Sequence, residues 1–162
     1  MSSKPQIDWD KQIKKLSRYA FEEGFEVIIK PAPKGISLIC FGSKQILIHS
    51  NLNKERQCYT IIHELGHLVL YKHKRKKFNK TLGYQYEKFT KKSMVYKIAE
   101  IEEEIVAWRS GYKLAKKLKL KINRDNFELY KSSLITTYLV YALKAKNNSN
   151  KTISTTPEGI SE

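Results

Sequence analysis

The residues from Gln45 to Tyr71 read QILIHSNLNKERQCYTIIHELGHLVLY, and this stretch contains the pattern that is most informative about the fold. Its first part, Gln45–His49, is a short apolar run followed by polar turn residues, which is typical of a β-strand. Asn53 then offers an N-cap, and Glu55 places a negative charge in the first turn, where the helix dipole favours it. We therefore expect a strand followed by a helix from about Lys54 to Tyr71.

This expected helix has an apolar side and a polar side. At about 100° per residue, its apolar residues cluster on one side, which is suited to lie on a sheet. Relative to that side, His63 and His67 are rotated by about 140° and 180°, so their imidazoles are expected to face away from the sheet. The apolar side consists of Cys58, Ile61, Ile62, Leu65 and Val69.

Two more short strands and a helix are expected before this stretch. Apolar runs at Glu26–Lys30 and Ile36–Phe41 lead toward Gln45–His49 through tight connections, so the three strands are predicted to form a small antiparallel meander. Asp10–Phe25 has apolar residues at helical spacing, and Gly24 stands where a helix would end. The sequence thus predicts an N-terminal helix before the sheet.

Two helices are expected toward the C-terminus, at about Met94–Leu120 and from the Asn123-Arg124-Asp125 segment to about Leu143. The predicted fold is therefore α+β, with a small antiparallel three-stranded sheet packed against the histidine-bearing helix, one N-terminal helix and two C-terminal helices. Residues 1–143 are expected to form a single domain. Residues 144–162 are polar and nearly free of large apolar groups, so we expect a disordered tail there.

Length and composition indicate a folded protein that does not span a membrane. The chain has 162 residues, 41% of them hydrophobic, which suits one folded domain. No apolar run approaches the roughly 18 residues needed to cross a membrane, and the N-terminus lacks the apolar core of a secretory signal. Cys40 and Cys58 form no CxxC pair and suit free thiols in a reducing compartment. We therefore expect a cytoplasmic protein without a membrane partner.

The helix carries the HExxH pattern at His63-Glu64-Leu65-Gly66-His67. Two histidines one turn apart can direct their ring nitrogens at the same metal ion, and zinc is the ion expected for this spacing. Glu64 is angled away from direct ligation but is close enough to take a proton from a water activated by the metal. We therefore predict His63 and His67 as zinc ligands and Glu64 as a general base.

A catalytic zinc usually has a third protein ligand, and two candidates are open. His73 has the offset of the third histidine in HExxHxxGxxH, but Leu70 replaces the glycine that allows the required turn. The other candidates are the acidic residues of the next helix, of which Glu104 lies nearest to the apolar stripe, at about 65° from its centre. Geometry favours Glu104, and the remaining acidic residues are Glu100, Glu102 and Glu103.

The charge of the chain is strongly positive, with 31 Lys and Arg against 16 Asp and Glu, a net charge of +15. A polyanion or an acidic protein is a plausible partner, although lysine-rich faces also serve solubility alone. Lysines gather in residues 72–92, interleaved with Phe78, Tyr84 and Tyr86. Two readings are open for this loop: a nucleic-acid-binding segment, or an ordinary solvated lid beside a cleft.

Gln45–Tyr71, followed by the segment EIEEEIVAWRSGYKLAKKL at Glu100–Leu118, resembles the ImmA/IrrE-type metallopeptidases, a gluzincin-like family with an HExxH helix and a later glutamate-bearing helix. The resemblance implies that Glu104 is the third zinc ligand. Ile105 and Trp108 stand where the family pattern has alanine and phenylalanine. Family members are zinc-dependent endopeptidases, and several cleave or displace a DNA-binding repressor.

Two functions are weighed on this basis. The first is a zinc endopeptidase acting on a protein substrate such as a DNA-binding repressor of a mobile element. It needs a donor for the transition-state oxyanion, for which Tyr71, His73, Tyr84 and Tyr86 are candidates. The second is a non-catalytic basic module that binds nucleic acid or an acidic protein through residues 72–92.

Overall fold

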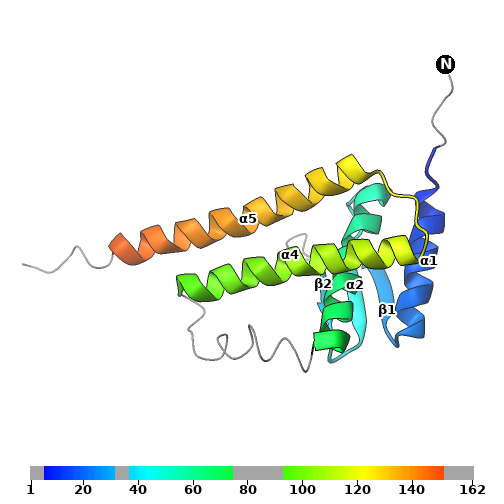
Figure 1. The fold of residues 1–162 in the computed structure, drawn as a ribbon, viewed down its shortest axis with the longest axis horizontal. Helices are drawn as coiled ribbons and strands as arrows, with labels where there is room; N and C mark the ends of the chain where they lie inside the picture. The colour runs from blue at the N-terminus through cyan, green and yellow to red at the C-terminus, as the bar shows by residue number, and fades with distance from the viewer. Residues whose placement is uncertain (1–5, 32–36, 75–92, 152–162) are drawn as a thin grey trace, which may run out of the picture.

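The computed structural model describes residues 6–31, 37–74 and 93–151 (Figure 1). Along the described chain, one helix precedes a small three-stranded sheet and further helices follow it, an α+β arrangement as predicted from the sequence. Cys40 and Cys58 are both free. Within the described ranges, no helix is both long and apolar enough to cross a membrane. The elements are α1 (Trp9–Glu22), β1 (Glu26–Lys30), β2 (Leu38–Cys40), β3 (Gln45–His49), α2 (Lys54–Lys74), α4 (Met94–Lys117) and α5 (Arg124–Lys151).

The sheet is mixed, so the predicted antiparallel meander is wrong. Its order is β1-β3-β2, with β3 parallel to β1 and antiparallel to β2. The central strand carries Ile46 and Ile48, both completely buried. The physical reason lies in the connection after Lys30, because its prolines Pro31 and Pro33 lack the N–H of a tight hairpin. Strands β1 and β2 are therefore not neighbours, and β3 lies between them.

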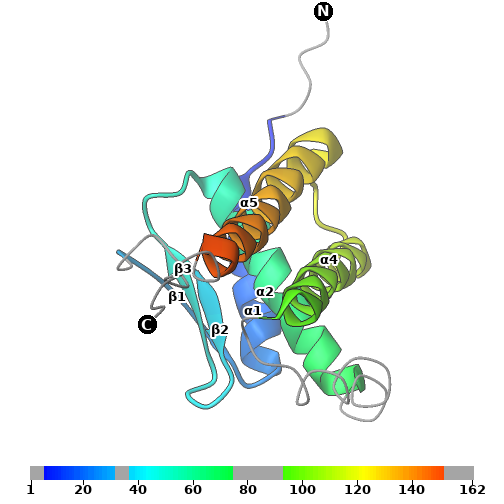
Figure 2. The ribbon, with the colours of Figure 1, turned by 90° about the vertical axis from the view of Figure 1, so that its left-hand side faces the viewer.

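Helix α2 lies at the centre of the molecule, between the sheet and α1 on one side and α4 on the other (Figure 2). Its predicted apolar side is buried, with Cys58, Ile61 and Leu65 fully inaccessible to solvent. Its opposite side is covered as well, since His63 and Glu64 are only 8% and 5% exposed. The helix that carries the HExxH pattern is thus enclosed on both sides.

Helices α2 and α4 cross with their backbones in direct contact. A Cβ atom added at Gly66 would lie 2.0 Å from the carbonyl oxygen of Ala107, and one added at Gly111 would lie 2.1 Å from the carbonyl oxygen of Ile62. Only glycine fits at these two positions, because any side chain would collide with the backbone of the facing helix. This crossing sets the distance between the residues of α2 and those of α4.

The helix ends differ from the predictions by a few residues at most positions and by more in α5. Helix α1 ends at Glu22, and Gly24 follows with a φ of +81°, a conformation that glycine adopts without strain. Helix α5 continues to Lys151, beyond its predicted end at Leu143. The rest of the predicted tail, residues 152–162, lies outside the described residues, as do residues 75–92 of the basic loop.

The start of α5 is fixed against α2 by polar and aromatic contacts. Asn126 donates a hydrogen bond from its side-chain amide to Glu55 at 2.9 Å, and the Tyr59 hydroxyl donates to the same carboxylate at 2.7 Å. The ring of Phe127 packs edge-on against Tyr59, with centroids 5.2 Å apart. From this anchor α5 runs beside α4 and forms a wall over the polar side of α2 (Figure 1).

Candidate metal centre

Three potential metal ligands converge between α2 and α4. His63 and His67 project from consecutive turns of α2, and Glu104 reaches them from α4. The Nε2 atom of His63 lies 3.0 Å from Glu104 Oε2 and 3.2 Å from His67 Nε2, and His67 Nε2 lies 3.5 Å from Glu104 Oε1. The potential ligand atoms of the three residues all lie within 4.8 Å of one another.

These separations fit a tetrahedral zinc ion. With zinc-to-ligand distances of about 2.0–2.1 Å, the ligand atoms at two corners of a tetrahedron lie about 3.3–3.4 Å apart. The observed distances of 3.0, 3.2 and 3.5 Å bracket this value. Glu104 Oε2 is buried and has no well-formed hydrogen bond, as expected for an atom that binds an ion instead. Two imidazoles and one carboxylate are also the ligand set of many catalytic zinc sites with an open fourth position.

The electrostatics of the cluster stabilise a negative charge on Glu104. Burial by itself would raise the pKa of its carboxyl, but the interactions with the adjacent rings of His63 and His67 outweigh burial and lower the pKa to about 2. For His67, burial favours the neutral ring, whereas Glu104, Glu64 and Glu103 together raise its pKa above the ordinary value. In the metal-free protein, His67 and Glu104 thus favour each other's charged forms.

Glu64 occupies a different position from the three converging residues. Its carboxylate is buried and accepts a hydrogen bond from the backbone N–H of Ile39 in β2. Burial raises the pKa of Glu64, although the nearby His63 and His67 act in the opposite direction. The sheet therefore holds this carboxylate beside the cluster, and the Ile39 N–H favours its charged form whereas burial favours the protonated one.

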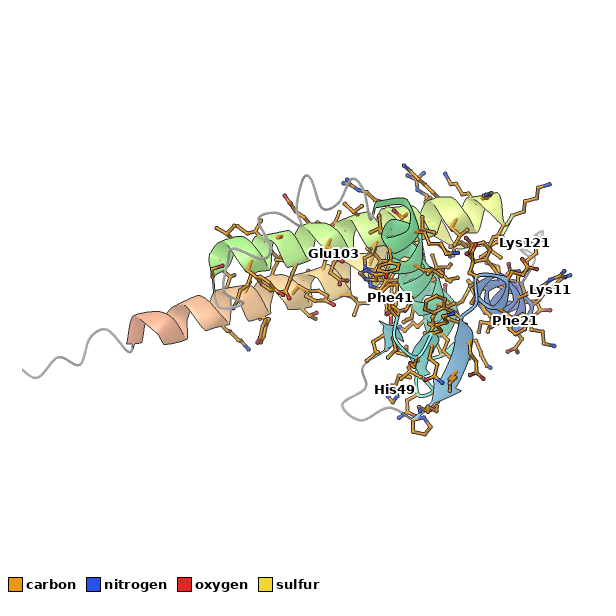
Figure 3. The ribbon with its side chains drawn as sticks, turned by 90° about the horizontal axis from the view of Figure 1, so that it is seen from below. Lys11, Phe21, Phe41, His49, Glu103 and Lys121 are labelled. Atoms are coloured by element: carbon orange, nitrogen blue, oxygen red, sulfur yellow. The ribbon has the colours of Figure 1, made fainter. Side chains whose placement is uncertain are left out.

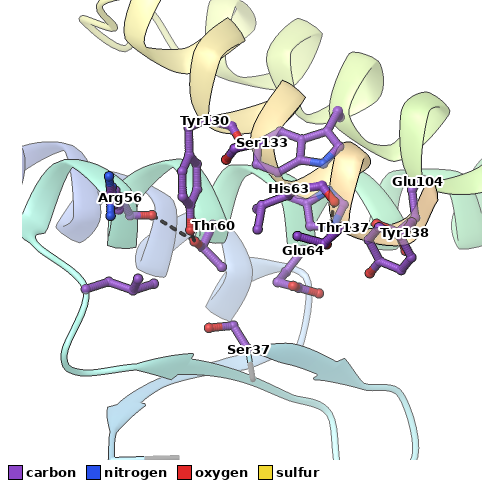
Figure 4. Close-up of a pocket in the computed structure, with 13 residues that line it drawn as sticks. Ser37, Arg56, Thr60, His63, Glu64, Glu104, Tyr130, Ser133, Thr137 and Tyr138 are labelled. Atoms are coloured by element: carbon purple, nitrogen blue, oxygen red, sulfur yellow. Dashed lines mark hydrogen bonds and ion pairs between the residues drawn. The ribbon is translucent and has the colours of Figure 1, made fainter. Parts of the chain in front are cut away.

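Glu64, together with His63 and Glu104 of the cluster, borders a cavity of about 470 Å³ (Figure 4). One wall comes from α2, the opposite wall from α5, and Ser37 contributes from the sheet side. The lining is rich in hydroxyl groups. It comprises Ser37, Leu52, Arg56, Thr60, His63, Glu64, Glu104, Trp108, Tyr130, Ser133, Leu134, Thr137 and Tyr138.

The ring of His63 is held in place by Trp108. The two rings stack with centroids 4.3 Å apart and an interplanar angle of 19°. Trp108 is 1% exposed and also packs against Phe127 of α5, so its own position is fixed. An aromatic residue at this position, where the family pattern has phenylalanine, therefore orients a potential ligand through packing.

Tyr138 belongs to the site but was not among the residues predicted from the sequence. It lies on α5 with its side chain close to Glu104 (Figure 4). Burial, followed by the charges of Glu104 and Glu64, raises its pKa, so the phenol keeps its proton as a donor. In the sequence, its spacing in an apolar series predicts only packing, and no signal connects it to the HExxH helix.

The other sequence candidates lie elsewhere. Tyr71 is 46% exposed, packs against Phe41 with ring centroids 4.4 Å apart, and is not among the residues that line the cavity. The side chains of His73, Tyr84 and Tyr86 lie outside the described residues. Among the acidic residues that the structure describes on α4, Glu104 is the one that joins the two histidines.

Comparison of the sequence with known protein families gives evidence on this site that does not depend on its geometry. Residues 20–96 match the model of the IrrE N-terminal-like domain, Peptidase_M78. This part of the chain is therefore similar to that family. The match confirms the ImmA/IrrE resemblance and identifies a metallopeptidase-type domain. The IrrE N-terminal-like region includes His63, Glu64 and His67 but ends before Glu104 and α5. No curated protein and no solved structure matches the chain significantly.

Proposed function

We propose that this protein is a zinc-dependent endopeptidase, in which His63, His67 and Glu104 hold the ion. The convergence of the three ligand atoms at tetrahedral spacing is the observation that carries the proposal. The match to a metallopeptidase family supports it independently, because that match rests on the sequence of residues 20–96 alone. The cavity beside the cluster offers room for a peptide segment.

A zinc ion bound here would act as a Lewis acid and lower the pKa of a bound water from about 15.7 to about 7. Glu64 is the base in this scheme, since its buried carboxylate has a raised pKa and borders the cavity. It takes the proton of the attacking water and transfers it to the amine that leaves when the peptide bond breaks. The Ile39 N–H keeps the carboxylate oriented for both transfers.

Tyr138 is our candidate for the oxyanion donor. Its hydroxyl is adjacent to Glu104 and lines the cavity shared with Glu64. Tyr130 lines the same cavity, but its hydroxyl is within 3.1 Å of Thr60 Oγ1, with which it forms a hydrogen bond. A phenol that stays protonated can donate to the oxygen of the scissile carbonyl as negative charge develops on it.

The metal content of purified protein tests the ligand set. We expect one zinc per chain by elemental analysis in the wild type and in Glu102→Ala, a matched control that removes an exposed carboxylate of the same helix. Glu104→Ala should lose most of the zinc, since a third ligand is removed. Full zinc occupancy in Glu104→Ala would refute the proposed ligand set.

A second variant separates metal binding from catalysis. Glu64→Gln should retain zinc yet lose cleavage of a proteome-derived peptide library, read by mass spectrometry, because the amide cannot accept the proton. Cleavage by Glu64→Gln at the wild-type rate would rule out Glu64 as the base. From the family resemblance, we propose that the substrate is a regulatory protein such as a DNA-binding repressor.

A further inference from the structure

A dense group of lysines lies at the end of the molecule away from the cavity, where α1 meets the C-terminal end of α4. All of its members are exposed. We call this group the lysine surface. It consists of Lys11, Lys14 and Lys15 of α1, Lys113, Lys116 and Lys117 of α4, and Lys119 and Lys121 in the turn after α4.

The two helices contribute their lysines with the same spacing. On each helix the three lysines stand at positions i, i+3 and i+4, which places them within an arc of about 100° on one face. Such an arrangement presents the three charges together to one partner. The helical parts of the lysine surface are therefore two short charged stripes rather than a scatter of isolated residues.

Direct contacts join the two stripes. The Lys15 ammonium donates a hydrogen bond to the carbonyl of Leu118 at 3.1 Å, and the backbone N–H of Lys121 donates to the Gln12 side chain at 3.2 Å. Figure 3 shows Lys11 and Lys121 beside each other at this end. The stripes therefore form one continuous positive surface.

The positive charge of this surface is not cancelled locally. Within the described part of the chain, none of its lysines forms an ion pair with a carboxylate. The nearest acidic residues of α1 are already engaged, since Asp8 accepts a hydrogen bond from the Lys11 backbone and Asp10 pairs with Lys54 at 3.0 Å. A surface of this kind attracts an extended polyanion.

We propose that the lysine surface binds the phosphate backbone of double-stranded nucleic acid. Protein–DNA interfaces are strongly positive and polar, whereas the core of a protein–protein interface is apolar and depleted in lysine. No large exposed apolar side chain of the described chain lies in Lys11–Arg18 or in Arg109–Lys121. A membrane surface would call for such apolar anchors, and a single strand would call for exposed aromatic rings.

This surface is separate from the proposed zinc site. Lys113 and Lys117 lie about 14 and 20 Å from Glu104 along α4, given a rise of about 1.5 Å per residue. Binding through the lysine surface therefore does not need the zinc, and a variant there leaves the cluster intact. It is also distinct from the loop at residues 72–92, to which the sequence alone directed the nucleic-acid prediction.

A matched pair of variants tests the location. Lys113→Ala with Lys117→Ala removes two charges from the surface, whereas Lys30→Ala with Lys144→Ala removes two exposed lysines elsewhere and leaves the same net charge. Fluorescence anisotropy would follow binding of the full chain to a labelled DNA duplex of about 20 base pairs over a range of salt concentrations. Circular dichroism checks that each variant is folded.

We expect micromolar binding of wild type in about 0.1 M salt, and a loss of about eightfold for each phosphate contact removed by the Lys113/Lys117 variant. Its salt slope should fall by about 0.9 per contact, while the control variant should retain the wild-type slope. No binding by wild type, or equal losses in both variants, would overturn the proposal. So would a Lys113/Lys117 variant that loses binding to phosphatidylserine vesicles but not to the duplex.

Discussion

Replacing Gly111 with alanine would test whether the helix crossing sets the geometry of the metal centre. The added methyl group would lie 2.1 Å from the backbone oxygen of Ile62, whereas an ordinary contact begins at 3.4 Å. The two helices would have to separate by about 1.3 Å, because the obstacle is backbone and cannot rotate away.

The loss in free energy of unfolding caused by Gly111→Ala follows from this displacement. Overpacking in a core costs about 1–3 kcal/mol, and a backbone obstacle justifies the upper end of that range. Alanine regains about 1 kcal/mol of helix propensity over glycine, so the net destabilisation of Gly111→Ala is about 2 kcal/mol. For a chain of this length, such a loss lowers the melting temperature by about 4–8 °C.

The same displacement of α4 would also move one of the proposed metal ligands. Ala107 contacts Gly66 between the two histidines and lies one turn from Glu104 on α4, so a wider crossing moves the carboxylate away from His63. Ligand distances in a working metal site vary by only about 0.2 Å. We therefore expect zinc affinity to fall by about tenfold or more, by comparison with the effect of losing other groups that support metal ligands.

Urea denaturation and zinc titration calorimetry would measure both effects in Gly111→Ala. Gly42→Ala is the matched control, because a Cβ atom added there meets nothing within 4 Å, and its stability should change by less than about 1 kcal/mol. A Gly111→Ala protein with wild-type stability and zinc affinity would refute the reasoning.

Three other predictions address the site. Tyr138→Phe should keep its zinc by elemental analysis but cleave peptides about 10²–10³ times more slowly, and an unchanged rate would exclude an oxyanion role. In the metal-free protein, the low pKa of Glu104 adds stability that is present above the ordinary value of 4.5 and is lost as the pH falls toward about 2. Urea denaturation across this range should show that loss, and Glu104→Gln should lack it. Finally, zinc at about 100 times its dissociation constant should stabilise wild type by about 2.7 kcal/mol in thermal or urea denaturation, but His67→Ala much less.

Local patterns in the sequence predict individual elements well. The bounds of β1 and β3 and the start of α4 match the prediction, and Asn53 accepts the expected capping hydrogen bond from the Arg56 backbone at 2.9 Å. These features depend on residues close together in the chain, such as turn formers, caps and apolar runs.

Features that depend on distant parts of the chain were harder to predict. The predicted strand order was wrong because the apolar runs of the three strands do not determine which strand lies in the middle of the sheet. The periodicity turns the two histidines of α2 away from the sheet without showing what covers them, whereas the structure shows α4 packed against α2 at the glycine crossing beside them. Glu104 could be ranked by its helical angle, but Tyr138 could not, because its role depends on how α5 returns over the cavity.

The cavity is built from two sets of residues with different origins. The three converging ligands and Glu64 come from α2 and α4, which meet backbone to backbone, whereas Ser133 and Thr137 line the opposite wall from α5. In a protease with this layout, the metal ligands and the general base are encoded apart from Ser133 and Thr137. Substitutions at these two positions, which leave Tyr138 in place, can therefore change which peptides are accepted while the hydrolytic residues stay intact, so duplicated genes can acquire different substrates.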